Sequence, residues 1–79
     1  MERSELPEDT LVADGFDDAI LGYSAYSPGR EQLVIYDYWK CIEILKTEGM
    51  TEEEAIEYLE FNTIGAWVGE KTPVFVYTE

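Results

Sequence analysis

Apolar and polar residues alternate in two short segments of the first half of the chain, a pattern typical of half-buried strands. Residues 19–26 read AILGYSAY, so that alternate side chains can share one face. Residues 32–38 read QLVIYDY and are rich in β-branched and aromatic side chains, which favour strands. Between them, Pro28 and Gly29 suit a type II or longer hairpin turn. We therefore expect the two segments to form an antiparallel β-hairpin.

After the second strand the apolar period changes to that of a helix. The residues that recur at i, i+3, i+4 and i+7 are Tyr38, Cys41, Ile42 and Leu45. Asp37 can cap this helix by accepting a hydrogen bond from an early backbone amide. Gly49 can adopt the left-handed conformation that ends a helix. A first helix is therefore expected between these two residues.

A second helix is predicted to begin almost at once. Thr51 is a favourable N-cap, and Glu54 stands three positions later, as a capping box requires. The inward line of this helix then runs through Ile56, Leu59, Thr63 and Trp67. Either Gly65 or Gly69 could end it, and the pattern leaves that choice open.

The turn GEKTP, residues 69–73, precedes a last apolar segment, VFVYT, residues 74–78. The predicted order is therefore strand, strand, helix, helix, strand, which is a small α+β fold of ββααβ type. We expect a three-stranded sheet with both helices on one face, and leave the strand order open. Because two antiparallel helices return the chain to the end where the second strand finished, the last strand should run antiparallel to the second strand or parallel to the first.

The chain is long enough for one domain with one core. Residues 14–79 are expected to form that single α+β domain. Residues 1–13 are polar, contain Pro7 and show no sustained period, which predicts a flexible acidic arm.

Charge limits the function classes. Eighteen Asp and Glu against five Lys and Arg give a net charge of −13, which repels nucleic acid phosphates and anionic membrane surfaces. We expect no direct nucleic acid partner and no membrane association. With one cysteine and no histidine, the usual zinc sites and Ser-His-Asp triads are excluded, so we expect neither an enzyme nor a cofactor. No apolar run approaches the ~20 residues of a membrane span, and the N-terminus lacks the apolar stretch of a signal peptide, which favours the cytoplasm.

The run of glutamates in residues 52–60 has two explanations. Glutamates in the first helical turn are stabilised by the helix dipole, so residues 52–54 need no function. Glu57 and Glu60 lie beyond that turn, and like-charge neighbours on a helix each cost a few tenths of a kcal/mol. A solvated helix face is the simpler explanation. The alternative is a surface that imitates nucleic acid, because the five charges are spaced roughly 3 Å apart along the helix, near the 3.4 Å of one DNA strand.

Three large rings stand together at the start of the first helix, in YDYWK, residues 36–40. Tyr38 and Trp39 are adjacent and face about 100° apart on a helix, so one of them should be exposed. An exposed ring among charges is typical of an interface hot spot. The candidate partner-binding residues are Glu53, Glu57 and Glu60, with Trp39 as an anchor.

Three other features have structural explanations that we favour over chemical ones. Asp14, Asp17 and Asp18 could hold a hard cation, but their spacing does not match an EF-hand loop and a turn explains them better. Asn62, among apolar neighbours, is predicted to be a buried polar residue bonded to the backbone. Cys41 lies on the buried stripe and is predicted to be an inert core thiol.

Four stretches taken together carry a resemblance: DGFDDAILG, YDYWKCIEIL, GMTEEEAIEYLEFN and GAWVGEKTPVF. In that order the chain resembles a group of small acidic hypothetical proteins of tailed bacteriophages. The resemblance implies a phage-encoded accessory protein that works in the cytoplasm of the bacterial host. It assigns no activity, cofactor or functional residue.

The leading hypothesis is a non-enzymatic protein-binding module. It would inhibit a host nucleic-acid-binding enzyme or a defence complex by charge mimicry, so its partner would be a host protein. The alternative is a homo-oligomeric structural or assembly protein whose charge serves solubility only. An enzyme comes third and would need a concave site with convergent carboxylates or a bound metal.

Overall fold

A computed structural model describes residues 3–7, 10–25, 27–64, 69 and 72–78. In chain order the strands and helices are β1 (Ile20–Tyr23), β2 (Val34–Asp37), α1 (Tyr38–Thr47), α2 (Glu52–Leu59) and β3 (Val74–Val76). Short helical turns lie at Arg3–Glu5 and Asp17–Ala19, and a π-helical turn follows α2 at Glu60–Ile64. The predicted ββααβ order with a three-stranded sheet is confirmed. Trp67 and Gly65 lie outside the described residues.

The sheet has the order β1-β2-β3, so β2 is the central strand. β1 pairs antiparallel with β2, with a shift in register between Ile20 and Gly22. At the far end of this hairpin, Ser27 bridges Arg30 and Gly29 has φ +80°, the left-handed conformation that the predicted turn requires.

The direction of the last strand corrects the sequence-based expectation. β3 pairs parallel with β2, with Ile35 opposite Val74 and Asp37 opposite Val76. An antiparallel β3 would have to begin where β2 ends, directly after the helices. Instead β3 begins beside the start of β2, because the connection after Ile64 is long enough to span the sheet before the strand starts.

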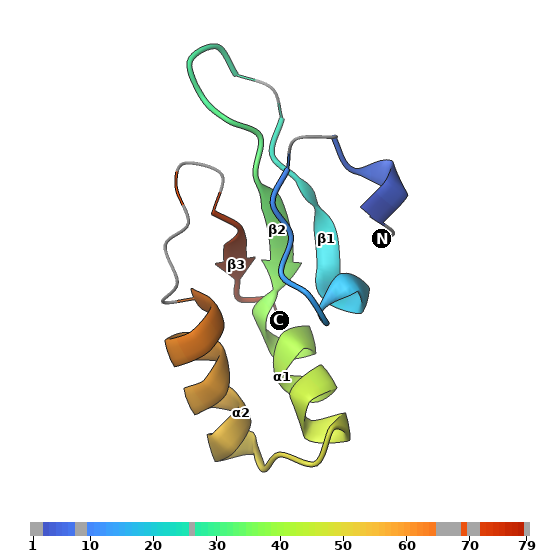
Figure 1. Cartoon of the computed structure of the whole chain (residues 1–79), viewed down its shortest axis with the longest axis vertical. Coiled ribbons are helices and arrows are strands. Elements are labelled where there is room, and N and C mark those ends of the chain that lie inside the picture. The colour runs from blue at the N-terminus through green and yellow to red at the C-terminus, as the bar shows by residue number, and fades with distance from the viewer. Residues whose placement is uncertain (1–2, 8–9, 26, 65–68, 70–71, 79) are drawn as a thin grey trace.

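The helices pack against each other and extend past one end of the sheet, as Figure 1 shows, and the molecule measures 41 × 23 × 23 Å. α1 follows β2 without a loop, because Asp37 is both the last residue of β2 and the N-cap of α1. Gly49, at φ +105°, ends α1 as predicted, and Thr51 starts α2 two residues later. Among the described residues, no helix has the length and apolar character needed to cross a membrane.

One core joins the sheet to the helices. The buried residues are Phe16, Ala19, Ile20, Val34, Tyr36, Tyr38, Cys41, Ile42, Leu45, Ala55 and Leu59. The ring of Tyr36 stacks on that of Phe75 in β3, with 5.1 Å between the ring centres. This contact ties the last strand to the core through an aromatic pair.

The described part of the predicted arm contacts this core. Leu6, Val12 and Ala13 pack against it, and the backbone N–H of Ala13 donates to the Tyr36 hydroxyl at 2.7 Å. That hydrogen bond gives the hydroxyl of the buried Tyr36 a donor. The flexibility of residues 1–13 stays a prediction.

Candidate partner-binding surface

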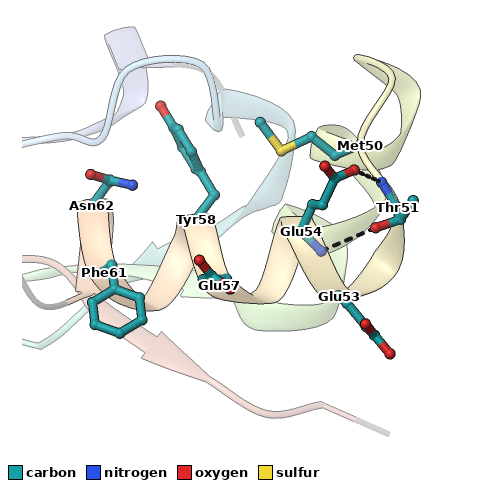
Figure 2. A pocket seen from close by; sticks show the side chains of 8 residues that line it. All are labelled: Met50, Thr51, Glu53, Glu54, Glu57, Tyr58, Phe61 and Asn62. Carbon is teal, nitrogen blue, oxygen red and sulfur yellow. Dashed lines mark hydrogen bonds between the residues drawn. The ribbon is translucent and has the colours of Figure 1, made fainter.

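The first turn of α2 separates a structural glutamate from an available one. Glu54 Oε1 accepts from the Thr51 backbone N–H at 2.9 Å, and Thr51 Oγ1 accepts from the Glu54 N–H at 3.2 Å (Figure 2). The predicted capping box is therefore present. Figure 2 shows Glu53 pointing away from this cap. Glu54 thus serves the helix, while the Glu53 carboxylate faces solvent.

The three predicted glutamates lie along one side of α2. Glu53, Glu57 and Glu60 line a shallow groove together with Ile56 and Phe61. Phe61 is the most exposed large hydrophobic side chain among the described residues, at 77%. The groove therefore combines a row of carboxylates with apolar surface.

A second hollow lies on the other side of the same row. It shares Glu53, Glu57 and Phe61 with the first groove, and Met50 and Tyr58 contribute to its lining. In Figure 2 the Tyr58 ring points up from the helix and the Phe61 ring points down, and both line this second hollow. The three shared residues therefore form a ridge, which we call the α2 ridge, between two shallow grooves.

Asn62 corrects a sequence-based expectation, because its side chain is exposed. In a continuous α-helix it would lie three residues after the buried Leu59 and share its face. The π-helical turn at Glu60–Ile64 widens the helix at this point and changes which side chains face inward. Asn62 instead lines the hollow beside Tyr58.

Glu60 connects the α2 ridge to the start of α1. Its Oε2 accepts a hydrogen bond from the Tyr38 hydroxyl at 3.1 Å. Burial first, and then the hydrogen bond and negative charge of Glu60, raise the pKa of Tyr38 from 10.0 to about 12. At neutral pH Tyr38 is therefore a stable donor that holds this carboxylate in place.

Three rings meet beside that hydrogen bond, and we call Tyr38, Trp39 and Tyr77 the aromatic platform. The ring centres of Tyr38 lie 4.9 Å from Trp39 and 4.8 Å from Tyr77, and those of Trp39 and Tyr77 are 5.8 Å apart. Tyr38 is buried, whereas Trp39 is 45% and Tyr77 is 72% exposed. The prediction that one of the two adjacent rings faces outward is confirmed, and the exposed one is Trp39.

Asp37 holds together the two segments that carry the exposed rings of the platform. Its Oδ1 accepts from the backbone N–H of Trp39 at 3.0 Å and of Lys40 at 3.3 Å, which is the predicted N-cap. The same oxygen accepts from Thr78 Oγ1 at 2.8 Å. One carboxylate therefore holds both the start of α1 and the segment that carries Tyr77.

Sequence reasoning missed two exposed rings of this surface. Phe61 had a local signal, because it follows Glu53 and Glu57 at successive i+4 positions and so belongs to the same helix side. Tyr77 had none, since its neighbours depend on the parallel pairing of β3 with β2. Both rings raise the apolar content of a surface that the sequence presents mainly as acidic.

The remaining chemical candidates are not gathered into a site. In the described part of the chain, no group of three or more Asp, Glu, His or Cys is arranged to hold a metal ion. Asp17 and Asp18 lie in the first turn of a short helical segment that follows the Gly15 turn. Cys41 is buried, and burial followed by the charge of Asp37 raises its pKa to about 12, which keeps the thiol protonated at neutral pH.

The α2 ridge shares its groove with Glu60, and Glu60 is hydrogen-bonded to Tyr38 of the aromatic platform, so the three together offer acceptors, negative charge and apolar area. A basic protein surface with exposed apolar groups would complement this combination. No family model matches the chain, and no curated protein or solved structure was found to match it.

Proposed function

We propose that this chain is a phage-encoded, non-enzymatic binding module that inhibits a host nucleic-acid-binding enzyme or defence complex by charge mimicry. It works in the bacterial cytoplasm and presents carboxylates where its partner otherwise meets phosphates. The observation that carries the proposal is the exposed row of Glu53, Glu57 and Glu60 beside the exposed ring of Phe61.

Two charges of this row, Glu57 and Glu60, lie beyond the first turn and are not needed by the helix. Glu53 and Glu57 are one turn apart, and like charges at that spacing destabilise a helix by a few tenths of a kcal/mol. A lysine at position 57 would have stabilised it. The row is therefore better explained by an external partner than by α2 itself, and the net charge of −13 would speed encounter with a basic surface.

The spacing of the row determines which property of a nucleic acid backbone it can imitate. Steps of four and three residues from Glu53 to Glu57 to Glu60 correspond to about 6 and 4.5 Å along the helix axis. Phosphates on one DNA strand rise by about 3.4 Å. The row therefore imitates the charge of a nucleic acid backbone more closely than its pitch, and it suits a partner whose basic side chains can adjust.

Exposed rings give such an interface its anchors. Aromatic residues dominate interface hot spots, and charged rims steer association while contributing less to affinity. Phe61 lines the same groove as Glu60, and Trp39 packs on Tyr38, which donates a hydrogen bond to Glu60. Affinity on this proposal comes from the rings, and selectivity for a basic partner comes from the carboxylates.

A pull-down from bacterial lysate at low and high salt tests the proposal. The wild-type chain is compared with E53Q/E57Q/E60Q, which removes three charges from the row, and with E5Q/E43Q/E48Q, which removes three exposed charges elsewhere. We expect a specific partner that the first variant loses and the second retains. Absence of a specific partner at every salt concentration, or equal loss in both variants, would overturn it.

Displacement by nucleic acid tests the mimicry separately. If the captured partner binds nucleic acid through the surface that contacts this chain, a duplex DNA oligonucleotide releases the partner from the immobilised chain. Release by salt but not by the oligonucleotide leaves acidic docking in place and overturns mimicry.

The exposed rings favour one alternative function, a homo-oligomeric structural or assembly protein. Phe61 and Tyr77 are 77% and 72% exposed, and a second copy could cover them. Two chains of charge −13 repel each other, which counts against this arrangement at low salt. Light scattering across a dilution series decides: a stable dimer or tetramer with protected aromatics supports the alternative, whereas a monomer supports the inhibitor.

A further inference from the structure

We propose that the aromatic platform is an arginine-binding site, in which the guanidinium of a partner side chain stacks on Trp39 and Tyr77 and donates to Glu60. This inference rests on the proposed function, because it names the chemistry by which the partner is held. It assigns the carboxylate of Glu60 a specific ligand, where the function proposed above requires only a basic surface.

The two outer rings are available to a ligand. Trp39 and Tyr77 are 45% and 72% exposed, with ring centres 5.8 Å apart and planes inclined by 45°. A cation within about 6 Å of a ring centre is attracted by the negative face of the ring. One guanidinium can therefore reach both rings at once.

The site is held in place before any ligand binds. The Thr78 hydroxyl donates to Asp37, which ties the segment carrying Tyr77 to the start of α1. The Tyr38 hydroxyl donates to Glu60 Oε2 and ties that carboxylate to the inner ring of the platform. Groups that are already ordered lose less conformational entropy on binding, so even a small site can select its ligand.

Guanidinium fits this arrangement better than ammonium does. It is planar, stacks on aromatic faces and is more weakly hydrated than the lysine head group, and its N–H donors form a rigid fork. One oxygen of Glu60 takes the Tyr38 hydroxyl, which leaves the other to accept from such a fork. Nucleobases also stack on exposed rings, but they arrive with phosphates that a chain of charge −13 repels.

The same partner segment can reach the α2 ridge. Glu60 is hydrogen-bonded to Tyr38 of the aromatic platform and also lines the groove with Ile56 and Phe61. An arginine on the platform would therefore bring neighbouring apolar residues of the partner to that groove. The occupant we propose is a basic protein segment that carries an arginine next to an apolar side chain.

Peptide titrations on the 15N-labelled full chain test the site without the natural partner. The probes are three peptides of alternating glycine with arginine, lysine or citrulline, the last of which keeps the shape of arginine without its charge. We expect the arginine peptide to shift the Trp39 indole N–H and the Tyr77 amide, with a Kd about two to five times lower than the lysine peptide. Equal affinities for arginine and lysine, or larger shifts away from the platform, would overturn the site.

Matched tyrosine variants separate the site from general charge attraction. Tyr77→Ala should abolish the preference for arginine over lysine, and Tyr77→Phe should keep it because the ring remains. Tyr23→Ala is the control, since Tyr23 is an exposed tyrosine on β1, outside the platform. A preference for arginine that survives Tyr77→Ala would contradict the proposal.

The two proposals can fail separately. If wild-type chain captures a lysate protein and Tyr77→Ala captures it equally well, the arginine site is wrong while the binding function stands. If the arginine peptide binds selectively at the platform but no lysate protein is captured at any salt concentration, the site stands and the inhibitor function is wrong.

Discussion

The two helices have similar lengths but opposite relations to the core. α1 buries four side chains, Tyr38, Cys41, Ile42 and Leu45. α2 buries only Ala55 and Leu59. On its exposed side α1 mixes charges, with Lys40 Nζ 3.8 Å from a Glu43 carboxylate oxygen. α2 carries four glutamates and no basic residue.

This difference separates the residues that hold the fold from those available to a partner. A helix with four buried side chains contributes to the core, and its mixed charges are what a solvated face needs. A helix with two buried side chains gives most of its surface to solvent, and its charge beyond the first turn, at Glu57, does not stabilise the helix. Substitutions on α1 should therefore change stability, and substitutions on the outer side of α2 should change binding.

The largest difference in the free energy of unfolding is expected between Leu45→Ala and Phe61→Ala. Leu45 is buried, and truncating a buried leucine costs about 2–5 kcal/mol through lost burial and the cavity left behind. Phe61 is 77% exposed, so its truncation should change the free energy of unfolding by no more than about 0.5 kcal/mol while weakening partner capture. Urea denaturation measures the first quantity. Equal losses of stability would remove the contrast.

High pH should also destabilise the molecule through α1. The pKa of Cys41 is raised from 9.0 and that of Tyr38 from 10.0, each to about 12. Between pH 9 and 12 the unfolded chain loses these protons first, so each group lowers the free energy of unfolding by up to about 1.4 kcal/mol per pH unit above its unfolded pKa. Below pH 9 neither group makes the free energy of unfolding depend on pH.

Urea denaturation from pH 8 to 11 measures this dependence. Tyr38→Phe should flatten the slope above pH 10, and Cys41→Ala should flatten it from pH 9. As a control for the loss of a tyrosine hydroxyl, Tyr23→Phe changes an exposed tyrosine on β1, outside α1. Identical slopes in wild type and both α1 variants would show that these groups do not control alkaline unfolding.

A smaller difference in stability is expected between variants that remove the two helix caps. Thr51→Ala removes one side-chain cap from α2 and should cost about 1 kcal/mol. Asp37→Ala removes the acceptor for two amides and for Thr78, so it should cost more and also loosen Tyr77. Thermal unfolding ranks the two variants, and the chemical shift of the Tyr77 amide reports the second effect. The opposite ranking would mean that the bond from Thr78 contributes nothing.

The smallest effect on stability is expected from Glu57→Lys. It replaces two like-charge pairs on α2 with opposite-charge pairs to Glu53 and Glu60, so the helix should gain a few tenths of a kcal/mol. Partner capture should fall at the same time, because the middle charge of the row is reversed. A variant that is more stable and binds equally well would show that the row serves solubility.

Features set by neighbouring residues could be predicted from the sequence. Asp37, the Thr51 and Glu54 capping box and Gly49 are all where they were expected, because caps depend on a few consecutive residues. The outward position of Trp39 follows from its place next to Tyr38 in the helix.

Features that depend on distant residues could not be predicted. The direction of β3 depends on how far the connection after Ile64 carries the chain. The exposure of Asn62 follows from a π-helical turn with no evident sequence signal. The bond from Thr78 to Asp37 joins residues 41 positions apart, so the aromatic platform appears only once the sheet is complete.

The separation of Asp37 from Thr78 along the chain affects the order of folding. The pairing of β1 with β2 and the packing of α1 on α2 close short loops, whereas β3 must find β2 across about forty residues, which is slower. We expect β3 to dock last and to be the first element to detach. The glutamate row of α2 can form without β3, but Tyr77 reaches Trp39 only after β3 is paired. A chain that is still folding would therefore carry the charge before it carries the aromatic anchor, and only the finished molecule would present both.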